Sequence, residues 1–167
     1  MKRIASFEKV AFKQFASAFE GVDEKTVQTV YDDIVLPVRA TAGSAGYDFF
    51  APFDITLKRN ETIKIPTGIR VKIENGWFLS VYPRSGLGFK YRLQLDNTVG
   101  IIDSDYYNSD NEGHIFVKIT NNSLTDKTLF VKKGEGFCQG IFTEFGITYD
   151  DDAEAIRNGG FGSTTKK

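Results

Sequence analysis

The sequence predicts an all-β protein with a single domain. The pattern of short apolar runs beyond residue 30 and the length of the chain support this prediction. Short runs rich in Ile, Val, Thr, Phe and Tyr are interrupted by Gly, Asn, Asp or Pro about every 8 to 12 residues. About ten strands of this kind favour a sandwich or a barrel. A chain of 167 residues can bury one core, whereas two halves would each be small for independent folding.

The first strands expected are residues 63–65 and 69–73, in which apolar and polar side chains alternate between two faces. Residues 75–76 are Asn-Gly, a dipeptide typical of hairpin turns, and the apolar run 77–82 follows directly. We therefore predict that 69–73 and 77–82 pair as a hairpin.

A second pair of strands is expected further along the chain. Residues 114–119 and 127–131 are joined by the polar turn 121–123, and residues 137–145 form a further strand.

The two ends of the chain have a different character. Five apolar residues at helical spacing predict a short amphipathic helix that ends near Gly21: Phe7, Val10, Ala11, Phe15 and Phe19. We expect residues 1–30 to form an extension packed on a core of residues 31–149, with membrane or targeting use as the alternative. Residues 150–167 are acidic and then glycine-rich, which predicts a flexible arm.

Composition excludes several classes of function. Lys and Arg number 21 against 22 Asp and Glu, so the net charge of -1 gives no field that would gather nucleic acid or anionic membranes. Cys138 is the only cysteine, which excludes an internal disulfide and fits a reducing compartment, by default the cytoplasm. No apolar run approaches the roughly 20 residues that a membrane span needs.

Three segments carry groups suited to chemistry. Residues 83–88 (PRSGLG) follow an expected strand and combine Arg84, Ser85 and Gly86, which suits either a phosphate cradle or a plain turn and helix cap. A helix that begins at Ser85 would direct its first amides at the anion. Asp103 ends an apolar strand and can orient or deprotonate a water molecule, although a turn aspartate is the alternative.

The third segment is the tail. Glycines surround Phe161, whose ring can stack on a planar base, while Arg157, Ser163 and Thr164 can bind terminal phosphate oxygens. A closing lid and a disordered tail are both compatible with this composition.

Taken in order, these segments resemble the five motifs of the trimeric dUTPase family. The match covers residues 37 to 164 and consists of 45–49 (AGYDF), 83–88 (PRSGLG), 100–106 (GIIDSDY) with Asn97 six positions before Asp103, 134–139 (GEGFCQ), and the glycine-rich tail. The resemblance implies a jelly-roll-like, distorted β-barrel subunit that assembles as a homotrimer with shared active sites. It also implies hydrolysis of dUTP to dUMP and pyrophosphate, which limits uracil incorporation into DNA and supplies dUMP for thymidylate synthesis.

The resemblance also assigns roles to residues. Asp103 would activate the water that attacks the α-phosphorus, and Arg84, Ser85 and Gly86 would hold the phosphates. Mg²⁺ would be carried by phosphates and water, with Asp48 and Gln139 as outer partners, unless Asp48 mainly braces the fold. The remaining substrate contacts implied are Asn97, Gly100, Ile101, Ile102 and Phe116 around uracil, Tyr106 beneath the sugar, Phe161 over the base, and Gln139, Arg157, Gly162, Ser163 and Thr164.

Three departures from the family pattern bear on these roles. Residues 107–112 lengthen the loop after Tyr106, Gly136 stands where the fourth motif often has arginine, and Arg157 lies four rather than five places before Phe161. Two other functions remain open at this point. One is a dCTP deaminase of the same fold, and the other is a dUTP-binding protein that presents loop 107–112 to a protein partner.

Overall fold

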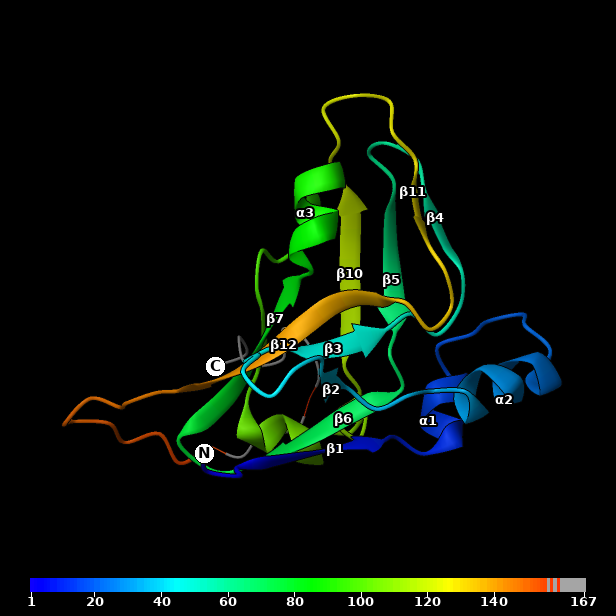
Figure 1. Cartoon of the computed structure of the whole chain (residues 1–167). Helices are drawn as coiled ribbons and strands as arrows, with labels where there is room; N and C mark the ends of the chain where they lie inside the picture. Colours follow the sequence, from blue (N-terminus) through cyan, green and yellow to red (C-terminus); the bar gives the residue numbers. More distant parts are fainter. Residues whose placement is uncertain (156, 158, 160–167) are drawn as a thin grey trace.

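The computed structural model describes residues 1–155, 157 and 159, and the predicted tail residues Phe161, Gly162, Ser163 and Thr164 lie outside them. The described chain is mostly β-structure with a few short helices (Figure 1). The helices are α1 (Phe12–Ala16), α2 (Glu24–Asp32), α3 (Ser85–Tyr91) and the 3-10 helix η1 (Ser104–Asn108). The strands are β1 (Ala5–Lys9), β2 (Val38–Arg39), β3 (Tyr47–Phe50), β4 (Ile55–Leu57), β5 (Thr62–Pro66), β6 (Ile69–Ile73), β7 (Trp77–Pro83), β8 (Leu93–Leu95), β9 (Gly100–Ile102), β10 (Phe116–Asn121), β11 (Leu129–Val131) and β12 (Gly136–Glu144).

The strands form a jelly-roll-like arrangement of small sheets around one main core. The largest sheet has the order β2-β3-β12-β7-β9, and a three-stranded sheet has the order β5-β10-β8. Two further pairs, β1-β6 and β11-β4, complete the described sheets. Most neighbours in space are distant in sequence, and the sheet neighbours β12 and β7 are separated by much of the chain, as the colours of Figure 1 show.

Alternation of side chains explains why these short strands are stable. In β6 the buried residues Ile69, Val71 and Ile73 alternate with Arg70 and Lys72. Strands β4, β8, β9 and β11 show the same pattern of buried, exposed, buried. Each strand therefore contributes one face to the core and leaves the other for solvent or for another surface.

The N-terminal extension differs from the predicted single helix. Phe7 lies in β1, which pairs along its whole length with β6, and the helix α1 begins only at Phe12. Local spacing alone favoured helix from Phe7 onward, but the edge of β6 offers backbone partners that a short helix cannot match. A second helix, α2, follows Gly21, and the Asp23 carboxylate caps it by accepting a hydrogen bond from the amide of Thr26 at 3.0 Å.

The two predicted hairpins are wrong in their pairing, although their strands form. Strand β6 pairs with β1, while β7 lies between β12 and β9. The turn at Gly76 is present, with φ of 84°, but β6 and β7 diverge after it into different sheets. Strands β10 and β11 diverge in the same way, because β10 pairs with β5 and β8 and β11 pairs with β4.

A small apolar cluster attaches the extension to the barrel. Val10, Phe15 and Val27 are buried in it, and Gly68 closes it from the barrel side. Gly68 has φ of +70°, and a β-carbon there would lie 2.3 Å from the Ile34 side chain and 3.1 Å from the Phe15 ring. Glycine at this position therefore allows the extension to approach the barrel closely.

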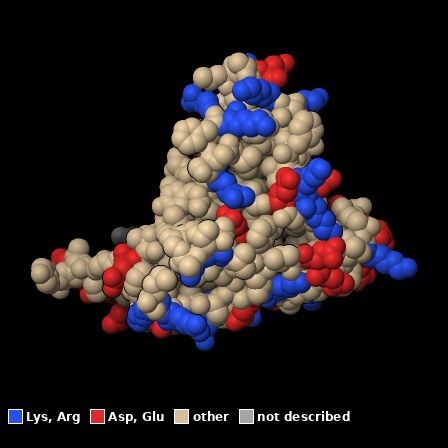
Figure 2. Space-filling view, in the orientation of Figure 1, with Lys and Arg blue, Asp and Glu red and all other residues tan. Residues whose placement is uncertain are grey.

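The surface seen in Figure 2 carries acidic and basic side chains interspersed rather than gathered into a stripe of one sign. Among the described helices, none combines the length and apolar character needed to cross a membrane. The proposed division of the chain at residues 30 and 150 stays a prediction.

Candidate active site

A cavity of about 370 Å³ lies between the β7–β9 edge of the large sheet and β10. Its lining includes four of the predicted base-binding residues: Asn97, Gly100, Ile102 and Phe116. Ile101 points away, because its side chain is exposed between the buried neighbours in β9. The cavity is mainly apolar with a few polar groups at its rim, which is the usual character of a small-molecule pocket.

Gly100 is what lets the strands around this cavity approach each other. A β-carbon at Gly100 would lie 3.1 Å from the β-carbon of Val81, which faces it across the β7–β9 ladder. A larger residue would either separate these strands or fill part of the cavity.

Asp103 follows β9 directly and stands at the start of η1, with its side chain half exposed. Tyr106, one turn later, is buried, and its hydroxyl donates a hydrogen bond of 2.8 Å to the carbonyl of His114. Burial raises the pKa of Tyr106, so its phenol stays protonated over the physiological range. The aromatic ring is therefore held beside the carboxylate-bearing turn.

Arg157 joins this group from the C-terminal arm. Its Nη1 lies 2.9 Å from an Asp103 carboxylate oxygen and 3.1 Å from one of Asp105, and its guanidinium lies 5.3 Å from the centre of the Tyr106 ring. In this structure Arg157 thus neutralises the carboxylate that the sequence singled out. Its role at terminal phosphate oxygens stays a prediction.

A second group of predicted residues gathers at the other end of β7. The Arg84 Nε lies 3.3 Å from Asp48 Oδ1, and its Nη1 lies 3.5 Å from the Gly136 carbonyl. Gln139 is paired directly with Asp48 across β12 and β3, and its amide nitrogen donates to the carbonyl of Pro83 at 3.5 Å. We call Asp48, Arg84 and Gln139 the cationic corner, since the Arg84 guanidinium stands at its exposed side.

Close packing of glycines shapes this corner. A β-carbon at Gly46 would lie within 2.4 Å of the Gln139 amide oxygen, and one at Gly136 would lie 2.7 Å from Arg84 Nη1. The fourth motif of the family often has arginine where this chain has Gly136. The small glycine leaves space for Arg84 Nη1 to reach the carbonyl oxygen of Gly136.

Ser85 and Gly86 begin α3, with Arg84 as the N-terminal cap residue. The carbonyl of Arg84 accepts hydrogen bonds from the amides of Leu87 and Gly88 at 3.0 and 2.9 Å, which closes the first turn. Arg84, Ser85 and Gly86 are all exposed at the end of β7, so they are accessible to a ligand outside this chain.

The cationic corner and Asp103 are far apart within one chain. Ile102 lies opposite Leu79 in the β7–β9 ladder, so Asp103 lies level with Phe78, whereas Arg84 comes six residues later at the other end of β7. At about 3.3 Å per residue this separates the two groups by about 20 Å. A single chain therefore does not present Asp103 and Arg84 to one phosphate group.

The cationic corner offers two neighbouring side chains with oxygen donors. No group of three or more metal-binding side chains occurs in the described part of the chain. Asp48 and Gln139 provide hard oxygen atoms side by side, and Asp48 is already engaged by Arg84. Cys138 is buried, and burial together with Asp48 raises the pKa of its thiol, which keeps it protonated.

Sequence reasoning missed several residues around the cavity. Lys64 lines it and holds its ammonium 4.4 Å from the centre of the Phe116 ring, and Lys118 forms a 2.8 Å ion pair with Asp96 at the rim. His114 is buried behind the same wall, where its Nε2 accepts a hydrogen bond from the Gly68 amide at 2.9 Å. No local signal marks these residues, since strand pairing brings them to the cavity.

Together, the fold and this cavity define a jelly-roll-like protein with a pocket of a size suited to a small molecule. A model of the dUTPase family matches residues 32–165. A deoxyuridine 5'-triphosphate nucleotidohydrolase of Lactococcus lactis is 42% identical over 134 residues, which are 78% of this chain and 88% of that protein. The dUTPase of Streptococcus mutans shares the fold with a TM-score of 0.63 and 33% identity, over 85% of this chain and 97% of that one.

A dUTPase from phage phi11 of Staphylococcus aureus, whose structure shows coordination of a structural Mg(II) ion, has a TM-score of 0.57 and 21% identity, over 71% of this chain and 89% of that one. At this identity the likeness concerns the fold alone. The chain belongs to the dUTPase family. It is a hydrolase acting on acid anhydrides that converts dUTP to dUMP and pyrophosphate.

Proposed function

We propose that the chain hydrolyses dUTP in active sites shared between the subunits of a homotrimer, with Asp103 as the catalytic residue. The observation that carries this proposal is the separation of about 20 Å between Asp103 and Arg84 along β7. Water activation and phosphate binding must act on the same triphosphate, so Arg84 has to come from another copy of the chain.

Base recognition is assigned to the cavity. Asn97 at its mouth, the backbone of Gly100 and Ile102, and the neighbourhood of Phe116 line the cavity, and with the intervening Ile101 backbone they would offer donors and acceptors for the edge of uracil. Cytosine presents a different order of donors and acceptors, so it would leave buried polar groups unpaired. The ring of Tyr106, in the helix η1 that follows β9, would lie beneath the sugar and exclude a ribose 2'-hydroxyl.

Hydrolysis begins when the Asp103 carboxylate orients a water molecule and accepts its proton as the oxygen attacks the α-phosphorus. The bond from this phosphorus to the bridging oxygen breaks, and the electron pair leaves with pyrophosphate. Arg84, Ser85 and the amide of Gly86, from a neighbouring copy, bind the phosphate oxygens and the charge that develops on them. For Asp103 to act as a base, Arg157 must leave the position in which it pairs with this carboxylate.

Mg²⁺, when bound, supplies positive charge to the phosphate chain. Asp48 and Gln139 would hold it through water molecules, because the described residues of the corner offer single oxygen donors rather than a cage. The arm, with Phe161, Gly162, Ser163 and Thr164, would close over the bound nucleotide. The single cysteine is consistent with a reducing compartment, and we place the enzyme in the cytoplasm.

A complementation experiment tests the sharing of sites. Asp103→Asn chains and Arg84→Ala chains are unfolded, mixed in equal amounts, refolded and assayed for pyrophosphate release from dUTP with Mg²⁺. Each variant refolded alone is expected to be nearly inactive, whereas in the mixture about a quarter of the sites combine an intact Asp103 with an intact Arg84 from different chains. Recovery of about a quarter of the wild-type activity supports the proposal, and a mixture no more active than its components excludes shared sites.

A further inference from the structure

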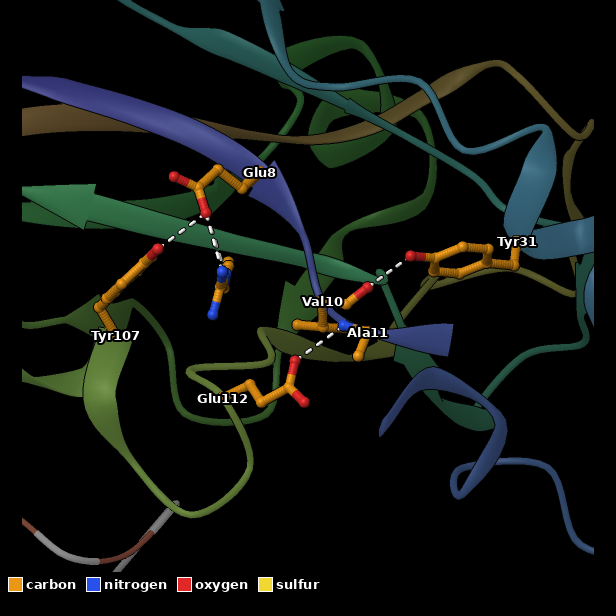
Figure 3. A network of polar contacts seen from close by, with 7 residues as sticks. Glu8, Val10, Ala11, Tyr31, Tyr107 and Glu112 are labelled. Carbon is orange, nitrogen blue, oxygen red and sulfur yellow. Dashed lines mark hydrogen bonds and ion pairs between the residues drawn. The ribbon is translucent and has the colours of Figure 1, made fainter. Parts of the chain in front are cut away.

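The two features that the family motifs leave unexplained, the N-terminal extension and loop 107–112, contact each other (Figure 3). Glu8 in β1 accepts a hydrogen bond of 2.7 Å from the hydroxyl of Tyr107. The same Glu8 oxygen is 2.9 Å from Arg70 Nη2, and the Arg70 guanidinium lies 4.4 Å from the centre of the Tyr107 ring. Glu8, Arg70 and Tyr107 therefore form a three-residue clamp between β1, β6 and η1.

A second contact holds the far end of the loop. The amide of Ala11 donates a 2.7 Å hydrogen bond to the carboxylate of Glu112. The adjoining Val10 is buried, and its carbonyl accepts from the Tyr31 hydroxyl at 2.6 Å, so this part of the extension is itself anchored to α2. Both ends of loop 107–112 are thus attached to a segment that lies outside the family motifs.

The clamp connects directly to residues of the active site. Tyr107 follows Tyr106 in η1, and the amide of Tyr106 donates to the carbonyl of Asp103 at 3.2 Å. Asn111 donates to the Tyr106 hydroxyl at 2.8 Å from within the loop. A shift of Tyr107 therefore moves Tyr106 and the turn that starts at Asp103.

Gly113 makes this turn rigid on its other side. It has φ of +70°, and a β-carbon there would lie 2.8 Å from both the carbonyl oxygen of Tyr106 and the Cα of Tyr107. Backbone is packed on backbone at this point, so η1 cannot relax toward Gly113 without opening the loop. The contact of Tyr107 with Glu8 holds η1 from the side of β1.

We propose that Glu8 is a positioning residue for dUTP hydrolysis, acting through Tyr107 to hold Tyr106 and Asp103 in place. This inference rests on the proposed function of Asp103. The N-terminal extension then serves as a support for the catalytic turn, in addition to covering part of the barrel. Neither Glu8 nor Tyr107 lines the cavity, so removal of their contact is expected to affect the catalytic step more than nucleotide binding.

The test compares Tyr107→Phe, Glu8→Gln and the matched control Glu74→Gln. Tyr107→Phe removes one hydroxyl and keeps the ring, and Glu8→Gln retains an acceptor for Tyr107 but loses the charge that pairs with Arg70. Glu74→Gln makes the same chemical change in the Lys2–Glu74 ion pair (2.8 Å), which lies at the opposite end of the β1–β6 pair from loop 107–112. Glu74 is exposed, Glu8 and Tyr107 are only partly buried, and each change roughly keeps the size of the side chain, so folding is expected to stay intact, which thermal unfolding checks.

We expect kcat for dUTP to fall about tenfold in Tyr107→Phe, the range expected when a charge-assisted hydrogen bond is lost, with KM changed less than about twofold. Glu8→Gln should give a smaller loss, and Glu74→Gln should match the wild type. The preference for dUTP over UTP, measured as the ratio of kcat/KM values, should fall in Tyr107→Phe because Tyr106 loses its fixed position. Wild-type kcat and preference in Tyr107→Phe, or an equal loss in Glu74→Gln, overturn the inference.

Amide hydrogen exchange separates this inference from the proposed function. Exchange of residues 103–113 should be faster in Tyr107→Phe than in the wild type and unchanged in Glu74→Gln. This readout needs no substrate. An Asp103→Asn chain that keeps wild-type activity would refute the proposed function while faster exchange still supported the clamp, whereas unchanged exchange refutes the clamp alone.

Discussion

The cavity and the cationic corner are built in different ways, although β7 runs between them. The cavity walls are strands joined by backbone ladders, with Val81 opposite Gly100 and the buried residues Ile102 and Val117 facing inward. The corner also rests on a ladder, in which Gln139 pairs with Asp48, but its cation, Arg84, lies just beyond the end of β7 and remains about half exposed. One chain therefore encloses the cavity by itself, whereas its corner presents Arg84 to the surroundings, where the proposed trimer would place another copy.

The largest expected effect concerns the pocket end of β7. Asp103→Asn removes the proposed proton acceptor but keeps the shape of the side chain, so kcat for dUTP should fall by roughly 10² to 10⁴-fold. KM should change little, because the cavity and the corner are intact. Steady-state pyrophosphate release measures both constants, and a loss confined to KM would place Asp103 in binding instead of catalysis.

The next largest effect is expected in the stability of the cavity wall at acid pH, where His114 is buried. Burial, with a contribution from the charge of Lys64, lowers the pKa of His114 to about 4, below its ordinary value of 6.5. The unfolded chain therefore takes up this proton at higher pH than the folded chain does. Stability is present in full above about pH 6.5 and falls as the pH approaches 4, by about 3 kcal/mol in total.

Urea unfolding between pH 7.5 and 4 measures this dependence, with His114→Gln as the comparison. Glutamine keeps an acceptor for the Gly68 amide but does not titrate, so the variant should lose less stability over this range than the wild type does. An equal slope in both proteins would show that the wall behind the cavity is not the acid-sensitive part.

Binding of a triphosphate analogue and of the uncharged nucleoside should distinguish the pocket from the corner. Arg84→Ala removes a charged hydrogen-bond donor, so affinity for a non-hydrolysable dUTP analogue should fall by roughly 1.5 to 3 kcal/mol. Affinity for deoxyuridine should hardly change. Gly100→Ala is the counterpart in the pocket, where overpacking against Val81 should weaken both ligands equally, by about 1 kcal/mol or more.

Calorimetric titration of both ligands into both variants gives the four free energies required. If Arg84→Ala weakened deoxyuridine as much as the triphosphate analogue, the corner and the pocket would not be separate sites of recognition.

The smallest effect is expected at Gly136. A β-carbon there would lie 2.7 Å from Arg84 Nη1, which is the end of a flexible side chain, so Gly136→Ala should displace the guanidinium from Asp48 rather than unfold the chain. We expect KM for dUTP to change a few-fold and stability to change by less than about 0.5 kcal/mol. A large loss of stability would mean that the corner is a structural contact first.

The sequence by itself determined the class of fold, the family and the positions of most strands. Alternation in β6, the start of α3 at Ser85 and the placement of Asp103 after β9 are consequences of neighbours in the chain, which local patterns report directly. The spacing of the motifs identified the family because each motif is short, local and ordered along the chain.

Only the tertiary structure decided which strands pair and what they bring together. The turn at Gly76 is a local signal, but the partners of β6 and β7 lie far away in the sequence, and pairing energy depends on the whole sheet. For the same reason Phe7 is in a strand despite its helical spacing, Arg157 meets Asp103, and Glu8 meets Tyr107 across the molecule. Contacts of this kind form between residues that are far apart in the sequence, so they depend on how the whole chain folds. A local pattern of apolar and polar residues carries no information about them.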